Sequence, residues 1–180
     1  MVQIPRITSP RFSLRELRDE DAGELHRILQ NPEVLRYFPS RNPPTMAKVE
    51  KLVESQQVHW DKHGYGWWAL ADGGSDALIG WCGLNYLPDT DEVELKYLLA
   101  EDCWGKGIAT EASLLSLRAG IMGTAIEQVV GIVHPENIAS QRVLEKVGMS
   151  FVNEAHYFGM DCLRYILTRE TYEDSMPITS

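Results

Sequence analysis

Apolar positions in the first third of the chain follow strand spacing and then helix spacing. Residues 11–17, RFSLREL, alternate polar and apolar side chains, which predicts a strand. Asp19 or Asp21 then caps a predicted helix with apolar residues at every third or fourth position. After a Pro-rich connection, the same spacing predicts a second helix that begins after Thr45 and stops at Gly64.

The middle of the chain changes to short apolar runs separated by turns. Three strands are predicted at 67–71, 77–84 and 92–100, and their short connections favour an antiparallel meander. The helical pattern then returns over 109–119, with alanine and leucine on one face, and ends at one of the glycines 120 and 123.

The last third predicts a strand at 128–134, a helix at 136–148 and a hairpin of residues 151–158 and 160–168. A frayed tail is expected from about Asp174. Because no repeat or linker divides the chain, we expect residues 1–180 to form one α/β (α+β) domain. Its sheet should be mixed, mostly antiparallel and twisted, with flanking helices.

The composition is that of an ordinary soluble globular protein, with 44% hydrophobic and 24% charged residues among 180. Lys and Arg number 17 against 26 Asp and Glu, a net charge of -9. Phosphate binding needs a concentrated basic face, so this balance disfavours direct nucleic-acid binding and suits an amine ligand.

The cysteines and the lengths of the apolar runs indicate the cellular compartment in which the protein is expected. Cys82, Cys103 and Cys162 are odd in number and form no CxxC pair, which indicates neither a disulfide framework nor a zinc site and fits a cytoplasmic protein. No run approaches 18 apolar residues and the start of the chain lacks a signal sequence, so no membrane association is expected. His59 and His63 have a metal-ligand spacing but no third ligand, and we expect them to be packing or surface residues.

The stretch WGKGIATEA, residues 104–112, leads from a strand through a glycine turn into a helix. The first amides of a helix have no partner within it and lie at the positive end of its dipole, so they can bind an anion. Gly105 and Gly107 remove the side chains that would keep a phosphate away. Walker A is absent, and the dinucleotide pattern GxGxxG fails at Thr110. The alternative is that the glycines only form the turn between the strand and the helix, without binding a ligand.

A second stretch, HPENIASQRVLEKVGM, has a polar pair at one end of a helix face. Asn137, Ser140, Leu144 and Val147 share that face by their spacing. Either a ligand touches the polar end, or Asn137 simply caps the helix.

Together these stretches resemble the GNAT acetyltransferase superfamily, particularly its RimJ/RimL-like branch of ribosomal-protein N-terminal acetyltransferases. The likeness covers nearly the whole chain, from PRFSLRELRDEDAGELHRILQNPEV through VELKYLLAEDCWGKGIATEA to NIASQRVLEKVGM and LRYILTRETYE. The phosphate turn of the family is [RQ]xxGx[GA]. This chain keeps Gly107 and Ala109 but has Trp104 where Arg or Gln is commonest. The resemblance implies a single GNAT domain.

The resemblance also implies acetyl-CoA as co-substrate, with no metal. The amides of residues 105–110 would hold its pyrophosphate, strand residues Leu98 and Leu99 would pair with the pantetheine arm, and Asn137 would contact the arm from the next helix. The expected cofactor-binding residues are therefore Leu98, Leu99, Trp104, Gly105, Lys106, Gly107, Ile108, Ala109, Thr110, Asn137 and Ser140.

The residue that would act as the catalytic acid differs from that of many family members. Many family members place a tyrosine seven residues after the asparagine, but this chain has Leu144 there. Ser140 is the hydroxyl best placed to protonate the departing thiolate, or it only orients the arm. A thiol with a pKa of about 8.5 is a tolerable leaving group near neutrality, so the missing tyrosine need not abolish the reaction.

A general base is needed because the attacking amine must be neutral. Glu92 and Glu94 lie on one face of the strand before the turn, where a half-apolar cleft could raise a carboxyl pKa. The alternative is that both carboxylates lie on a solvent-exposed face of the strand and have no catalytic role. By its match to the family pattern ELxYxL, Glu94 is the expected base, acting through water.

The predicted function is direct acetyl transfer from acetyl-CoA to a primary amine, the α-amine of a protein N-terminus being favoured. Small amines such as aminoglycosides, polyamines or amino-acid derivatives are the alternative acceptors. A non-catalytic acyl-CoA sensor and a nucleotide-binding protein of another fold are the remaining possibilities. Either a monomer or a homodimer is compatible with the sequence.

Overall fold

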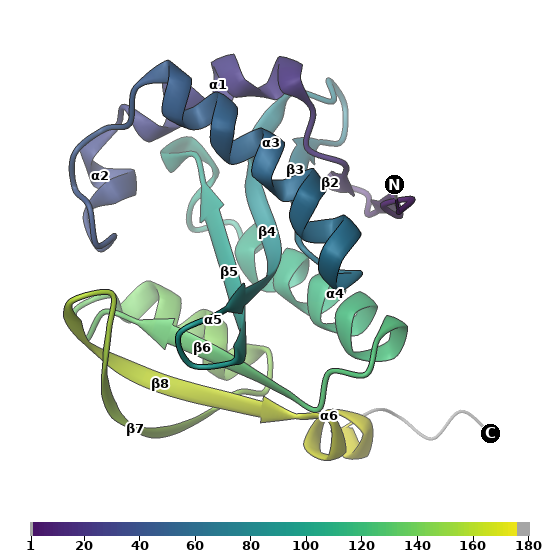
Figure 1. Cartoon of the computed structure of the whole chain (residues 1–180), viewed down its shortest axis with the longest axis vertical. Coiled ribbons are helices and arrows are strands. Elements are labelled where there is room, and N and C mark those ends of the chain that lie inside the picture. Colours follow the sequence, from purple (N-terminus) through teal and green to yellow (C-terminus); the bar gives the residue numbers. More distant parts are fainter. Residues whose placement is uncertain (1, 176–180) are drawn as a thin grey trace.

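The computed structural model describes residues 2–175, and in this part the strands form one eight-stranded sheet of order β1-β2-β3-β4-β5-β6-β8-β7 (Figure 1). Its strands are β1 Ile7–Thr8, β2 Phe12–Arg15, β3 Trp67–Asp72, β4 Leu78–Leu87, β5 Glu92–Leu99, β6 Gln128–Val133, β7 Ser150–Tyr157 and β8 Met160–Thr168. The helices are α1 Ala22–Leu29, α2 Pro32–Leu35, α3 Met46–His63, α4 Ile108–Gly123, α5 Ile138–Lys146 and α6 Arg169–Ser175, with 3-10 turns η1 Asp19–Asp21 and η2 Glu101–Cys103. All neighbouring strands are antiparallel except β5 and β6. The predicted mixed, mostly antiparallel sheet is confirmed.

Three short elements were not expected from the sequence: β1, α2 and α6. Pro32, which the spacing treats as lying past a helix end, occupies the first position of α2, where its missing N–H costs nothing. Asn31 caps this helix by accepting a hydrogen bond from the amide of Glu33 at 3.0 Å. The tail expected from about Asp174 begins within the end of α6, and its residues 176–180 lie outside the described part.

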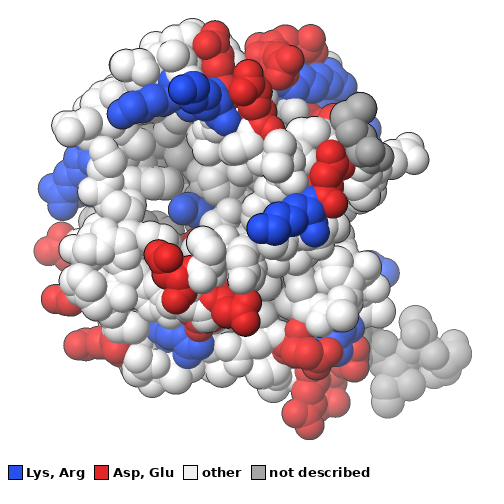
Figure 2. Space-filling model, in the orientation of Figure 1, with Lys and Arg blue, Asp and Glu red and all other residues white. Residues whose placement is uncertain are grey.

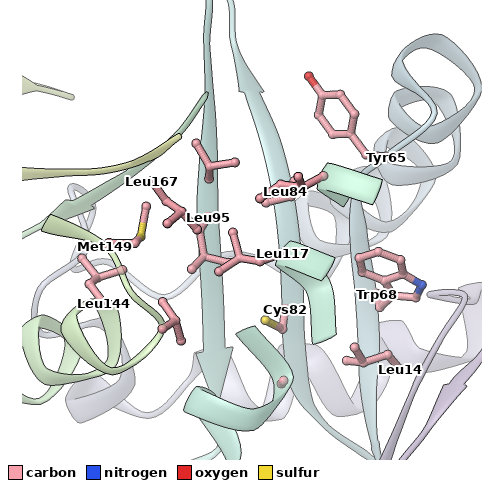
Figure 3. Close-up of a cluster of buried hydrophobic side chains, with 14 of the residues drawn as sticks. Leu14, Tyr65, Trp68, Cys82, Leu84, Leu95, Leu117, Leu144, Met149 and Leu167 are labelled. Carbon is pink, nitrogen blue, oxygen red and sulfur yellow. The ribbon is translucent and has the colours of Figure 1, made fainter. Parts of the chain in front are cut away.

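Helices cover both faces of the sheet, and alternation along the strands assigns side chains to each face. Leu25 of α1 and Val49 of α3 pack with Trp81 and Leu98 on one face. On the other face, α4 packs against the alternate positions of β4 and β5, where Figure 3 shows Leu95 beside Leu117. The predicted α/β domain therefore has its core in two layers.

The central strand β5 is paired unequally along its two edges. Its register with β4 runs over eight residue pairs, from Gly80 opposite Leu99 to Leu87 opposite Glu92. Its parallel register with β6 consists of one pair, Glu94 opposite Val130, after which the strands diverge (Figure 1). Beyond Glu94, the main-chain groups of β5 that face β6 therefore have no strand partner in the described chain.

Candidate active site

The glycine turn between β5 and α4 leaves a row of amides open. Gly105 and Gly107 have φ angles of 72° and 75°, and Gly107 is the residue that precedes α4. The first amide that bonds back into the helix is that of Glu111, which donates to Gly107 O at 3.1 Å. Within the described chain, the amides of residues 105–110 make no hydrogen bond, and a Cβ on Gly105 would meet no atom within 4 Å. The turn therefore fits an anionic diphosphate.

Two side chains, one distant in sequence and one within the turn, hold this turn in place. Arg11, just before β2, donates from Nη1 to the carbonyl oxygen of Lys106 at 2.6 Å and also pairs with Glu111. Trp104 donates its indole N–H to Leu99 O at 3.0 Å while its side chain stays 44% exposed. Arg11 lies 95 residues before Lys106, and no spacing in the sequence connects the two.

Glu94 is a buried carboxylate with an unused oxygen. It is 3% exposed, and its Oε2 has no hydrogen-bond partner among the described residues. Burial raises the pKa of Glu94 above its ordinary value, although the nearby Lys96 acts in the opposite direction. A carboxylate in this state can accept a proton, as the sequence predicts for this residue.

Glu92 is different, although it lies on the same face of β5. It accepts hydrogen bonds from Arg164 at 2.6 Å and from the Tyr157 hydroxyl at 2.7 Å. Burial alone would raise the pKa of Glu92, but these bonds keep it below its ordinary value. Glu92 therefore joins β5 to β7 and β8 and is not free to act as a base.

The start of α5 brings the predicted polar pair together. Asn137 caps the helix, because its Oδ1 accepts the amide of Ser140 at 3.2 Å. Both side chains also line the same cleft as Glu94, so capping does not remove Asn137 from the site. The Tyr97 hydroxyl donates to the carbonyl oxygen of Ser140 at 3.3 Å, and burial raises the pKa of Tyr97.

The cleft opens where β5 and β6 diverge, between the segment 37–39 and the β7–β8 turn. Figure 2 shows it as a hollow with basic atoms inside and at its upper rim. The cleft encloses about 100 Å³ and opens to solvent. Its lining residues are Tyr37, Phe38, Pro39, Glu94, Leu95, Lys96, Tyr97, Ile132, Val133, His134, Asn137, Ser140, Leu144, Phe158, Met160 and Cys162.

The structure thus gathers only some of the predicted residues in the cleft: Glu94, Asn137 and Ser140. The turn residues Trp104, Gly105, Lys106, Gly107, Ile108, Ala109 and Thr110 lie apart, past the end of β5. Leu98 and Leu99 are buried in the strand between the two places, so any ligand contact there would go through the main chain. Lys96, Tyr97 and Phe158 also line the cleft, but no sequence pattern points to them, because their shared surroundings depend on the tertiary fold.

The aromatic and histidine clusters of the first half pack within the protein. Trp67 and Trp81 stack with ring centroids 4.0 Å apart and do not line the cleft. His59 and His63 lie 4.6 Å apart, and burial is the main cause that lowers the pKa of His59 to about 4. Residues 2–175 contain no group of three His, Cys, Asp or Glu side chains that could hold a metal. None of their helices is long and apolar enough to cross a bilayer.

Comparison with known proteins gives consistent matches. Residues 11–150 match the family described as "Acetyltransferase (GNAT) domain". YkkB, an uncharacterized protein of Bacillus subtilis (strain 168), is 28% identical over 154 residues, 81% of this chain and 86% of YkkB. Spermidine N(1)-acetyltransferase of Escherichia coli (strain K12) is 24% identical over 141 residues, 78% of this chain and 74% of that enzyme.

Among solved structures, the fold is similar to that of RimL, a ribosomal L7/L12 α-N-protein acetyltransferase in complex with coenzyme A. The TM-score is 0.78 at 18% identity, and the match covers 91% of this chain and 98% of RimL. At this identity the likeness concerns the fold alone.

Proposed function

The chain belongs to the GNAT acetyltransferase family, and from this premise we propose that it acetylates the α-amine of a protein N-terminus, with Glu94 as general base. As a member of this family it is an acetyl-CoA-dependent N-acetyltransferase. The acceptor and the roles of individual residues are the proposed part. The choice follows the resemblance to the RimJ/RimL-like branch, and RimL itself is named as an α-N-protein acetyltransferase in complex with coenzyme A.

One observation carries the assignment of the base: Glu94 lines the cleft, and its buried Oε2 has no hydrogen bond among the described residues. Neutralising an α-amine of pKa near 7.8 costs about 1 kcal/mol at pH 7, against about 4.6 kcal/mol for a lysine of pKa near 10.4. A carboxylate with a raised pKa is a better proton acceptor than an ordinary one. The site therefore suits a weakly basic amine.

The residues that would hold the coenzyme form a path along β5. The amides of residues 105–110 would bind its diphosphate, since they make no hydrogen bond within the described chain. Of the two predicted strand residues, Leu99 would pair with the pantetheine arm along the unpaired edge of β5, because the carbonyl oxygen of Leu98 faces Gly80 of β4. Asn137 would contact the arm from α5, and the reactive thioester would then lie near Glu94.

In the proposed step, Glu94 accepts the proton of the amine, directly or through water, while the amine nitrogen bonds to the thioester carbonyl carbon. The C–S bond then breaks, and the thiolate takes a proton from Ser140 or from solvent. Ser140 is suited to this role because it lines the cleft beside Asn137. No covalent enzyme intermediate is needed.

Thiol release from acetyl-CoA tests this function, with peptides that carry free or blocked N-termini and with small amines, including spermidine. We expect release with free N-termini and none with blocked ones. Acetylation of small amines alone would favour the alternative acceptor class, to which the spermidine acetyltransferase relative points. Binding of acetyl-CoA without turnover on any amine would favour a sensor. No calorimetric heat with acetyl-CoA would overturn the coenzyme site.

A further inference from the structure

Lys96 brings a positive charge into the cleft that has no hydrogen-bond acceptor among the described residues. The residue lies two positions after Glu94 on β5, so both side chains leave the same face of the strand. Its Nζ makes no hydrogen bond among the described residues, and its only ion-pair contact is Glu94 Oε2 at 4.0 Å. The side chain is only 26% exposed. An ammonium group with three donors is thus held partly away from water without a direct acceptor.

Aromatic rings fix the position of this ammonium group. Nζ lies 5.8 Å from the ring centroid of Trp67 and 5.4 Å from that of Phe158. These contacts favour a cation at this place, but they satisfy none of its hydrogen bonds. Phe158 belongs to the β7–β8 turn that borders the cleft, so the charge faces the space where an acceptor would enter.

Glu94 and Lys96 therefore offer complementary vacant sites for hydrogen bonds: an acceptor on Oε2 and donors on Nζ, 4.0 Å apart. A ligand that satisfies both must present a cationic or neutral amine and an anion close to each other. A polyamine would satisfy Glu94 but would bring a second cation toward Lys96, which is unfavourable in a partly dry cleft.

We infer that the acceptor of this enzyme carries a carboxylate next to its reactive amine, and that Lys96 binds this carboxylate while Glu94 faces the amine. Free α-amino acids have this chemistry, and so do peptides whose first residue is Asp or Glu. The inference rests on the proposed function, since it identifies the substrate class of the same site. It predicts that polyamines and aminoglycosides are poor acceptors.

The test is an acceptor panel measured by kcat/KM for thiol release. One arm uses peptides that differ only in a first residue of Asp, Asn, Glu, Gln or Lys, and the other uses glycine, alanine and their amides, which lack any carboxylate. We expect the carboxylate-bearing member of each pair to be favoured about tenfold or more in the arm that contains the true source, mainly through KM. Which arm shows the higher rates distinguishes a peptide from a free amino acid.

Variants of Lys96 assign the preference to this residue. Lys96→Met should remove the discrimination, and Lys96→Glu should reverse it in favour of the peptide that begins with Lys. Lys51→Met, which changes an exposed lysine on α3, is the matched control and should keep the wild-type preference. Unchanged acetyl-CoA affinity by calorimetry will show that each variant is folded.

The outcomes separate the two proposals. Acetylation without any preference for a carboxylate, or a preference that survives in Lys96→Met, would overturn the inference and leave the proposed enzyme intact. If wild-type protein acetylates no amine in the panel, the proposed function fails and the inference fails with it.

Discussion

The two edges of β5 differ strongly in the number of residue pairs that they form with the neighbouring strands. Toward β4, eight residue pairs form a continuous register, and Gly80 lets the strands approach so closely that a Cβ would overlap the carbonyl oxygen of Leu98. Toward β6, the register ends after Glu94 opposite Val130. One strand therefore holds the sheet together on one edge and leaves main-chain groups without a strand partner on the other, within the described residues.

The largest expected effect is on the open edge, at Glu94. Glu94→Gln should lower kcat/KM at pH 7 by about 10²- to 10⁴-fold, the usual contribution of a general base. In wild type the rate should fall as pH drops through the raised pKa of Glu94, because the protonated acid cannot accept a proton. The variant should lack this acid limb. A pH-rate profile of both proteins checks the prediction, and an unchanged profile would remove Glu94 from the role.

Glu94→Gln should raise the stability of the protein, although it lowers the rate of the reaction. A carboxyl whose pKa is raised by folding stabilises the fold only while it is protonated, and this contribution is lost as pH rises through the folded-state pKa. Glu94→Gln should therefore melt higher than wild type at neutral pH. Glu92→Gln is the matched control: it should keep most of the rate but lose about 1 kcal/mol, because Arg164 loses its carboxylate partner.

On the paired edge, Gly80→Ala should affect folding rather than turnover per folded molecule. The added methyl group would meet the main chain of β5, and the φ of 153° disfavours any side chain. We expect a loss of about 3 kcal/mol in the free energy of unfolding, measured by chemical denaturation. A loss below about 1 kcal/mol would mean that β4 and β5 can separate, and the contrast between the edges would weaken.

Gly105→Ala probes the open end with the same added methyl group. Apart from the chain neighbours of Gly105, no atom of the described residues lies within 4 Å of the new Cβ. The free energy of unfolding should therefore fall only by the cost of placing a residue with a side chain at positive φ, about 1–2 kcal/mol. The methyl group would occupy free space beside the turn that the diphosphate is proposed to fill, and calorimetry should show acetyl-CoA affinity reduced about tenfold. Gly23→Ala, in open space on α1, should leave the affinity unchanged. Equal affinities in both variants would argue against the turn as the diphosphate site.

The smallest effect is expected at Cys103, which lies near the open end but outside the cleft. Burial raises the pKa of this thiol, so little thiolate is present at pH 7. Cys103→Ala should keep kcat within about twofold of wild type if the amine attacks the thioester directly. An inactive but folded variant would instead indicate an acetyl-cysteine intermediate.

Features with local causes were predictable from the sequence. The turn at Gly105 and Gly107, the helix that follows it and the cap at Asn137 each depend on residues within one helical turn, and the structure contains all three. Pro32 shows the limit of such reasoning, since the same residue can follow one helix and begin another.

The electrostatic state of the site depends on long-range contacts and could not be predicted. Glu92 and Glu94 are equivalent in a strand pattern. The approach of Arg164, 72 residues from Glu92, gives Glu92 hydrogen bonds to a guanidinium group, whereas Glu94 Oε2 has no hydrogen bond among the described residues. The setting of Lys96 likewise depends on Phe158 from a distant hairpin. Residue type and the alternation of side chains along a strand do not predict which distant residue will contact each of these side chains.

The exposed indole of Trp104 gives the protein a built-in optical probe. Trp60, Trp67, Trp68 and Trp81 are all buried, whereas Trp104 is 44% exposed and stands directly before the glycine turn. An aqueous fluorescence quencher such as iodide should therefore reach the emission of one tryptophan selectively. Coenzyme seated on the neighbouring amides would shield that emission, so occupancy of the turn can be titrated by light on unlabelled protein.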